Sequence, residues 1–181
     1  MEKISILGRA GSGKSYVAKE LGKIFNLPVI YFDHYHCNPD KTFIEKDIFV
    51  QKIFSLMNDK WILDGNHSRD DELTKKRFTE SNLIVFLDFS EQDCIEAIKQ
   101  RSGKKRDDIP DYLIENDNDT AWLINHTKEW DIDKKPELVI SQISKYNKNG
   151  MVIILKNRKQ VNDFLNAIKK QSGSTASGLV E

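Results

Sequence analysis

The chain is poor in cysteine and histidine and has no excess of charge of either sign. Its 181 residues include two cysteines and four histidines, too few to indicate a disulfide framework. Basic and acidic residues both number 28, so the net charge does not favour nucleic acid or membrane binding. No apolar run is long enough to span a bilayer, and no secretory segment opens the sequence. We therefore expect a soluble, cytoplasmic protein with free thiols, monomeric by default.

Short apolar runs and amphipathic segments alternate along most of the chain. Strand-like runs occur at 3–8, 29–33, 61–64, 83–89 and 151–155. Helix-like periodicity occurs at 14–25, 44–57, 71–79, 90–100 and 161–169. The run LIVFLDF is nearly continuously apolar, which is typical of a strand buried on both faces. This alternation predicts a three-layer α/β/α fold with a five-stranded parallel sheet.

The region 102–136 interrupts this alternation. It is polar and charged, and it contains SGKKRDDIPD and ENDNDT. A long polar insertion inside a compact α/β domain is often a mobile lid. Residues 172–181 are small and polar, which indicates a flexible tail or an expression remnant. We therefore predict one domain over 1–171, with a helical or irregular lid at 102–136.

The stretch GRAGSGKS joins the first predicted strand to the first predicted helix. It fits G-x-x-x-x-G-K-[ST], with Gly8, Gly13, Lys14 and Ser15 at the defined positions. Glycines let backbone N–H groups approach phosphate oxygens, and the helix N-terminus adds partial positive charge. Lys14 would contact the terminal phosphates, and Ser15 would offer its hydroxyl to Mg²⁺. The alternative is a glycine-rich turn, which has no need of the lysine and serine. The motif predicts a P-loop NTPase fold that binds a nucleoside triphosphate with Mg²⁺.

Three aspartates, Asp33, Asp64 and Asp88, follow or end predicted strands. Ligands bind at this edge of open α/β sheets. The GRAGSGKS segment (residues 8–15), called the phosphate loop below, lies at the same edge. One carboxylate could orient Mg²⁺ through water, and another could accept a proton from an acceptor hydroxyl. A helix cap or turn is the alternative for each. We favour functional roles for Asp33 and Asp64, and a structural role for Asp88, because a capped helix begins directly after it at Ser90.

Several segments resemble those of known P-loop kinases. ILDGNHSR resembles the DG-x-x-R segment that ends the third strand of adenylate-kinase-like enzymes, and IKQRSGKKR resembles the entry to their lid. The order of LPVIYFD, WILDGNHSR and LIVFLDF is more similar still to the small bacterial P-loop kinases known as DNA topology-modulation proteins. The resemblance covers about residues 1–170.

The resemblance implies a set of ATP- and Mg²⁺-binding residues. Those that hold the donor phosphates would be Gly8, Ala10, Gly11, Ser12, Gly13, Lys14, Ser15 and Tyr16. Ser15 and Asp64 would bind or lie near the metal. Arg101 would lie over the base, while Lys104, Lys105 and Arg106 would close from the lid. The alternative for this lid cluster is an ordinary solvated charged surface.

The resemblance also implies where the acceptor binds. Asp33 would face the acceptor, and Arg69 would reach an acceptor phosphate or carboxylate. The catalytic residues would then be Lys14, Asp33, Asp64 and Arg69. His67 could line the acceptor pocket or could have no role in binding.

Two further patterns favour ordinary structural roles. In DHYHC, His34 and His36 are two apart on a segment expected to be extended, so they would point to opposite sides. A pocket wall is therefore favoured over a metal site. Trp122 and Trp130 are eight apart and fit one apolar helix face in the core better than a stacking platform.

The sequence leaves two classes of function open. The first is a kinase that transfers phosphate from ATP to a nucleotide, nucleoside or small hydroxylated metabolite. The second is a regulatory protein that binds ATP or ADP, related to DNA topology, with little turnover; a slow ATPase is a third possibility. A signalling GTPase is not favoured, because NKNG at 147–150 lacks the aspartate of the guanine-reading NKxD motif.

Overall fold

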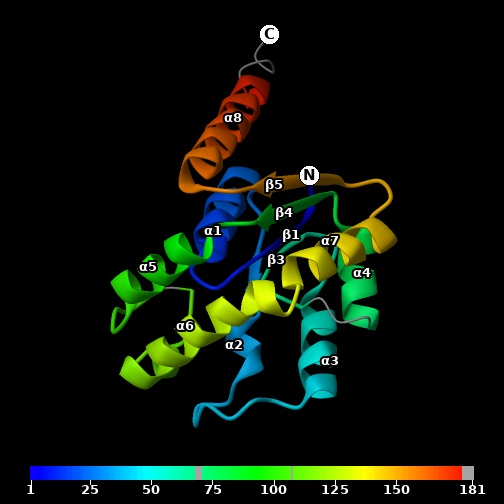
Figure 1. Ribbon diagram of the computed structural model, residues 1–181. Helices are drawn as coiled ribbons and strands as arrows, with labels where there is room; N and C mark the ends of the chain where they lie inside the picture. The colour runs from blue at the N-terminus through cyan, green and yellow to red at the C-terminus, as the bar shows by residue number, and fades with distance from the viewer. Residues whose placement is uncertain (68–70, 107, 177–181) are drawn as a thin grey trace.

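The sheet contains five parallel strands in the order β2-β3-β1-β4-β5. The computed structural model describes residues 1–67, 71–106 and 108–176, with side chains up to residue 172. The strands are β1 (Lys3–Gly8), β2 (Val29–Tyr31), β3 (Trp61–Asp64), β4 (Leu83–Leu87) and β5 (Met151–Leu155). The predicted five-stranded parallel sheet is confirmed, and helices surround it in Figure 1.

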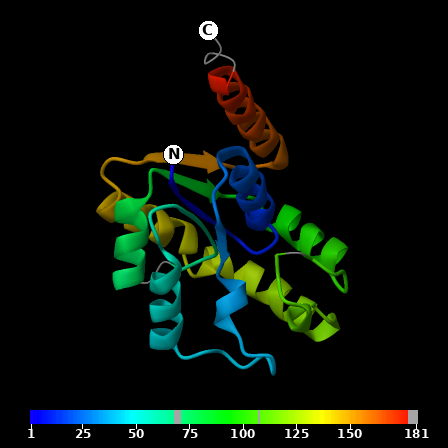
Figure 2. The same cartoon turned by 180° about the vertical axis from the view of Figure 1, so that it is seen from behind.

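Helices occupy the intervals between the strands, and α8 follows the last strand. They are α1 (Lys14–Phe25), α2 (Asp33–His36), α3 (Lys46–Leu56), α4 (Glu72–Glu80), α5 (Glu91–Arg101), the 3₁₀ turn η1 (Asp111–Leu113), α6 (Asp117–Ile132), α7 (Lys135–Tyr146) and α8 (Arg158–Ala176). α8 therefore continues into the segment expected to be a tail, and its far end lies away from the sheet in both views (Figures 1 and 2). None of the helices in the described residues is long and apolar enough to cross a membrane.

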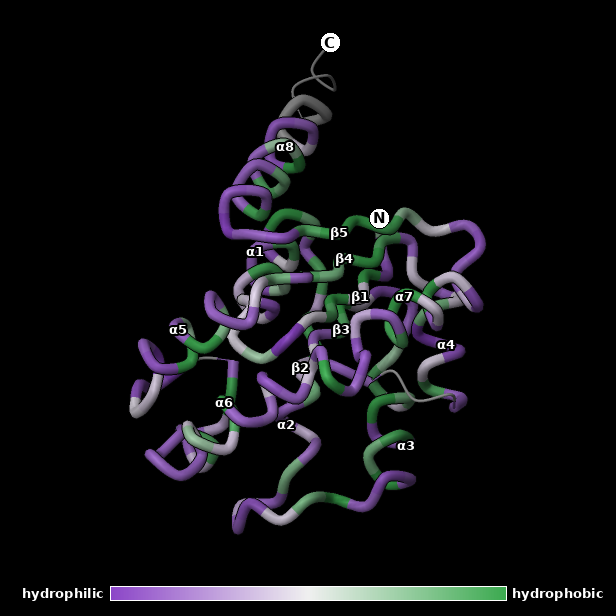
Figure 3. Tube along the Cα trace, viewed as in Figure 1, coloured by the Kyte–Doolittle hydropathy of each residue, from purple (hydrophilic) through white to green (hydrophobic). Residues whose placement is uncertain are grey.

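Strand β4 illustrates how both faces of the sheet are covered. Leu83, Val85 and Leu87 belong to an apolar cluster that includes side chains of α1 and α8. Ile84 and Phe86 join side chains of α4, α6 and α7 in a second cluster. Figure 3 shows the strands as mainly hydrophobic segments inside more hydrophilic helices. Because both faces are covered, the strand is apolar throughout, as its sequence predicts.

The central position of β1 brings the phosphate loop next to β3 and β4. Ile6 of β1 lies opposite Asp64 of β3 and opposite Val85 of β4. The carboxyl ends of the parallel strands therefore meet at one edge, where β1 continues into the loop. This register places Asp64 beside the start of that loop.

Helix α7 has no counterpart in the sequence-based prediction, which assigned no element to 137–150. Its first turn contains Pro136, where the missing N–H costs no hydrogen bond. Val139 and Ile143 are buried at the spacing of one helical face. The apolar residues of this segment do have helical spacing, but the polar sequence before them gives no clear sign that a helix begins.

The tryptophans of α6 have different environments. Trp130 is 5% exposed and packs in the apolar cluster on one face of the sheet, as expected. Trp122 is 56% exposed. The prediction of a core position for Trp122 is therefore wrong. With 3.6 residues per turn, positions eight apart are rotated by about 80° around the helix, so a narrow buried face cannot hold both.

Candidate functional site

The loop between β1 and α1 depends on three glycines with positive φ. Gly8, Gly11 and Gly13 have φ of 149°, 82° and 90°. A Cβ at Gly11 would lie 2.3 Å from the carbonyl oxygen of Cys94 in α5. Gly13 is the N-cap of α1, and no described side chain caps this helix. The N–H groups of the first turn are thus available to an anion such as phosphate.

Lys14 is partly buried at the start of α1. Its Nζ donates to the carbonyl oxygen of Arg9 at 3.1 Å. Desolvation lowers the pKa of the ammonium group, while the charges of Asp64 and Asp33 oppose this effect. The cation is therefore held between the loop and two carboxylates, close to where the loop would bind phosphate.

Asp64 ends β3 and is 5% exposed. Its Oδ1 has no hydrogen-bond partner among the described residues. Burial raises the pKa of Asp64 to about 6, although the charge of Lys14 and a hydrogen bond with Ser15 lower it. At neutral pH the carboxylate is therefore ionised and has an oxygen available for a hard cation.

Ser15 and Asp64 together fit a Mg²⁺ site. Both supply oxygen, and the unpartnered Oδ1 of Asp64 is buried beside the phosphate loop. Within the described part of the chain, no three His, Cys, Asp or Glu side chains form a group suited to a metal ion. Mg²⁺ does not require such a group, because it keeps several waters and is bound through phosphate oxygens with one or two carboxylates.

Asp33 reaches the site from a helical turn and not from the end of a strand. The prediction that β2 continues through Asp33 is wrong, because β2 ends at Tyr31 and α2 begins at Asp33. The N–H of Phe32 still donates to the carbonyl oxygen of Asp64 at 2.9 Å, after which the backbone turns. Asp33 is exposed and lines the same cavity as the phosphate loop.

The same turn contains His34 and His36, so the extended conformation predicted for them is also wrong. His36 lines a second cavity, described below, in agreement with the pocket-wall interpretation. His34 lies between Tyr31 and Tyr35 in ring contacts of 5.2 and 6.2 Å between centroids.

The two arginines predicted to bind the nucleotide, Arg101 and Arg106, are paired with acids of the segment that follows them. Arg101 and Arg106 both reach Oε1 of Glu115, at 2.9 and 3.1 Å. Arg106 also pairs with Asp108 through Nε, at 2.9 Å, and through its terminal nitrogen. Burial raises the pKa of Asp108, but hydrogen bonds with Arg106 and Ser15 outweigh this effect, so the pKa is lowered overall. A bound nucleotide would therefore compete with Glu115 and Asp108 for these arginines.

The two lid lysines differ in position. Lys104 is exposed and does not line the cavity of the phosphate loop. Lys105 does line it and pairs with Asp111 at 2.9 Å. Of these two lysines, Lys105 therefore lines the cavity and Lys104 does not.

A cavity of about 520 Å³ lies in front of the phosphate loop. It is lined by most of the predicted donor-site residues, namely Ala10, Gly11, Gly13, Lys14, Ser15, Tyr16, Arg101 and Arg106. It is also lined by Asp33 and Asp64. Gly8 and Ser12 are buried and do not line this cavity, and Arg69 lies outside the described residues. The structure thus brings together residues from four separate segments of the chain.

Asn66 connects the phosphate loop to the segment after β3, a role that the sequence did not reveal. Its Oδ1 accepts from the N–H of Gly8 at 3.0 Å, and its Nδ2 donates to the carbonyl oxygen of Gly8 at 2.6 Å. Asn66 also lines both the first cavity and the second. The string DGNHSR indicated a site, but the pairing with Gly8 depends on how β1 and β3 lie side by side.

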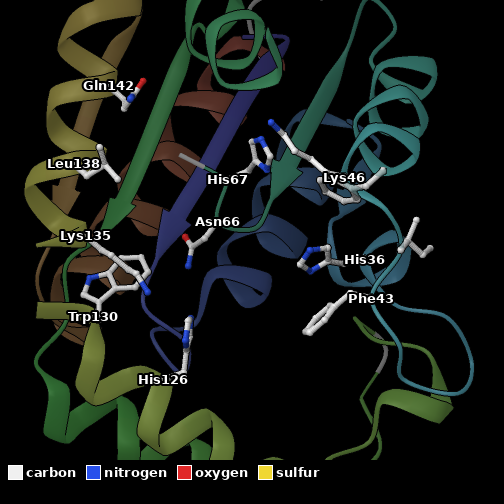
Figure 4. A pocket seen from close by; sticks show the side chains of 12 residues that line it. His36, Phe43, Lys46, Asn66, His67, His126, Trp130, Lys135, Leu138 and Gln142 are labelled. Carbon is white, nitrogen blue, oxygen red and sulfur yellow. The ribbon is translucent and has the colours of Figure 1, made fainter. Parts of the chain in front are cut away.

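The second cavity has a volume of about 680 Å³ and lies between α3 and the α6–α7 pair (Figure 4). One wall is formed by residues from α2 to α3, namely His36, Phe43, Ile44, Lys46 and Phe49. The other is formed by His126, Trp130, Lys135, Leu138 and Gln142. Asn66 and His67 lie between the walls, so His67 does line a cavity next to the phosphate loop.

Arg77 of α4 forms hydrogen bonds with the ends of β1 and β3. It is fully buried and donates to the side chain of Ser5 and to the carbonyl oxygens of Ile6, Leu63 and Gly65. Burial lowers the pKa of this guanidinium to about 9, so it is still charged at neutral pH. The site therefore rests on a buried cation that no sequence pattern predicts.

Solved structures that resemble this chain were found by comparison of folds. Shikimate kinase from Acinetobacter baumannii, in complex with shikimate, matches with a TM-score of 0.55 and 16% identity, over 99% of this chain and 96% of that one. Shikimate kinase from Bacteroides thetaiotaomicron matches with a TM-score of 0.57 and 14% identity, over 94% and 97%. This chain has the fold of small P-loop kinases.

A further match extends the comparison to another kinase. Gluconokinase from Sinorhizobium meliloti 1021 matches with a TM-score of 0.50 and 14% identity, over 99% of this chain and 98% of that one. No protein-family model matches the chain, and no curated protein is similar to it in sequence. At these identities the matches establish the fold, and the function must be argued from the site.

Proposed function

We propose that this protein transfers the γ-phosphoryl group of ATP–Mg²⁺ to a small acceptor that carries a hydroxyl group. The observation that supports this most is the pair of cavities that share Asn66. One cavity contains the phosphate loop, while the other is separate from it and large enough for a small molecule. A protein that only hydrolysed ATP would need the first cavity alone. The fold neighbours include kinases of shikimate and gluconate, both hydroxylated acids, which agrees with such an acceptor.

The residues around the first cavity have distinct roles in this proposal. Lys14 and the N–H groups at the start of α1 would bind the phosphates of ATP and stabilise the charge that develops during transfer. Mg²⁺ held by Ser15 and Asp64 would neutralise phosphate charge. Asp33, exposed in the cavity, would orient the acceptor hydroxyl or take its proton. If the acceptor is a nucleotide that reacts through its phosphate, Asp33 would only orient it.

The test is an assay of ADP formation with ATP, Mg²⁺ and a panel of acceptors that includes nucleosides, nucleoside monophosphates, shikimate and gluconate. We expect one acceptor to raise the rate well above the acceptor-free rate, and Lys14→Ala to remove this stimulation. ATP binding without stimulation by any acceptor would contradict the proposal. In that case, binding to DNA with a steep salt dependence would favour the regulatory function, and acceptor-independent turnover would favour an ATPase.

A further inference from the structure

The second cavity is lined by two lysines and, within the described part of the chain, by no acidic side chain. Lys46 enters from α3 and Lys135 from α7, so their ammonium groups come from opposite walls (Figure 4). The first cavity differs, because Asp33, Asp64 and Asp108 line it. The first cavity also has basic side chains in its lining, so its carboxylates and cations occur together, whereas the second has lysines without carboxylates. The second cavity is therefore suited to an anion.

Lys46 can turn towards a ligand without leaving its carboxylate partner unpaired. Its Nζ lies 3.2 Å from Asp71, and its side chain is 46% exposed. Asp71 also accepts a hydrogen bond from the N–H of Thr74 at 3.0 Å and pairs with His67 at 2.9 Å. Asp71 would keep these two partners, so little is lost when Lys46 moves.

Lys135 is held at the opposite wall. Its Nζ lies 3.1 Å from Asp133, whose side chain is half exposed and does not line the cavity. The same ammonium group lies 6.0 Å from the ring centroid of Trp130. Water can solvate Asp133 in place of the lysine, so Lys135 is also available to an anion inside the cavity.

The rest of the lining includes aromatic rings and further polar side chains. Phe49 and Trp130 are buried and present their rings from the two walls. Burial, followed by the nearby charge of Lys135, lowers the pKa of His126, which therefore adds a polar N–H at neutral pH but no charge. Gln142 is buried, and its Oε1 has no hydrogen-bond partner among the described residues, so it can accept from a ligand hydroxyl or N–H.

We propose that the phosphoryl acceptor is a small organic anion, a carboxylic acid or a phosphate ester, whose charged group binds between Lys46 and Lys135. Its carbon body packs between Phe49 and Trp130, and its reacting hydroxyl points past Asn66 to the first cavity. This inference rests on the proposed kinase function. It assigns the choice of acceptor to two lysines on different elements, α3 and α7.

The experiment compares matched charged and neutral acceptors: shikimate with its methyl ester, gluconate with glucose, and a sugar monophosphate with the free sugar. ADP formation gives the KM for each acceptor, and calorimetry in the presence of ADP and Mg²⁺ gives its Kd. The variants are Lys46→Met and Lys135→Met. The matched controls are Lys75→Met on α4 and Lys128→Met on α6, both exposed and outside the cavity lining.

We expect a charged acceptor to be used and its neutral partner to be poor. Each cavity variant should raise the KM and Kd of the charged acceptor by about 10- to 100-fold, the usual effect of losing a hydrogen bond to a charged group. The KM of ATP should stay unchanged, and both control variants should behave as wild type. The carboxylate and phosphate members of the panel distinguish the two kinds of anion.

The outcomes separate this inference from the proposed function. If ADP forms but the neutral acceptor is preferred, or both cavity variants use the charged acceptor as well as wild type, the inference is overturned and the kinase function stands. If no acceptor stimulates ADP formation, the kinase function fails. Anion binding that is lost in both cavity variants would then still support an anion site, and absence of anion binding would overturn it.

Discussion

At the scale of single residues, the ionisation of Asp64 couples metal binding to pH. Its pKa is raised to about 6, chiefly by burial. Below this pH the carboxylate gains a proton and becomes a poor Mg²⁺ ligand. We expect the affinity for ATP–Mg²⁺ to fall as the pH is lowered from 7.5 to 5, which calorimetry at a series of pH values can measure. An affinity that is constant across pH 6 would contradict this assignment.

The same group should affect the stability of the nucleotide-free protein in the opposite direction. A pKa raised in the folded state stabilises the fold at low pH, and this stabilisation is lost as pH rises through about 6. Asp64→Asn mimics the protonated form, so it should raise the Tm more at pH 7.5 than at pH 5. Asp88→Asn, at a partly exposed loop position, is the control and should show no such difference.

Arg77 is a second residue whose replacement has a clear expected effect. Arg77→Met would remove the donors of four buried hydrogen bonds, to the side chain of Ser5 and to the carbonyl oxygens of Ile6, Leu63 and Gly65. We expect a loss of about 3–5 kcal/mol in the free energy of unfolding, measured with urea. Arg158→Met, at an exposed position of α8, should change it little. A loss below 1 kcal/mol (about the value of one ordinary hydrogen bond) would show that Arg77 is dispensable.

At the scale of elements, the phosphate loop is fixed by its contact with α5. Gly11→Ala would place a Cβ 2.3 Å from the carbonyl oxygen of Cys94, in addition to the strain of a positive φ. Gly103→Ala shares the positive φ of 69° but has open space around it. We expect Gly103→Ala to cost about 1 kcal/mol in stability without affecting ATP binding. Gly11→Ala should cost more and weaken ATP binding, as urea unfolding and calorimetry can show.

The elements also show which parts of the structure the sequence can predict. The strands and the phosphate loop depend on local patterns, and their limits at β1, β3 and β5 agree with the prediction to the residue. The part of the first cavity that the phosphate loop lines was predicted from the same local motif. The second cavity could not be predicted, because Lys46 and Lys135 are far apart in sequence and meet only through the packing of α3, α6 and α7. Asp33 lies at the predicted edge of the sheet, but it belongs to the single helical turn α2 and not to β2.

At the scale of the whole molecule, ion pairs connect the end of α5 to the segment before α6. Glu115 is buried and pairs with both Arg101 and Arg106. Glu115→Gln would leave two partly buried cations with less compensation, so the Tm of the free protein should fall. The freed arginines should bind the nucleotide more tightly, and the rise in Tm on adding ATP–Mg²⁺ should become larger than in wild type. Glu137→Gln, exposed on α7, is the control. A smaller ATP-induced rise in Glu115→Gln would mean that Glu115 positions the arginines for the nucleotide and does not compete with it.

The lining residue that the two cavities share has a consequence for inhibitor chemistry. Asn66 borders both spaces, and its side chain is fixed by two hydrogen bonds to Gly8. An adenosine polyphosphate joined by a short tether to an organic acid could therefore fill both spaces at once. Once one half of such a compound is bound, the other half is present at a high effective concentration, so its affinity can exceed that of either half alone. The length of the best tether would measure, in solution, how far apart donor and acceptor are held.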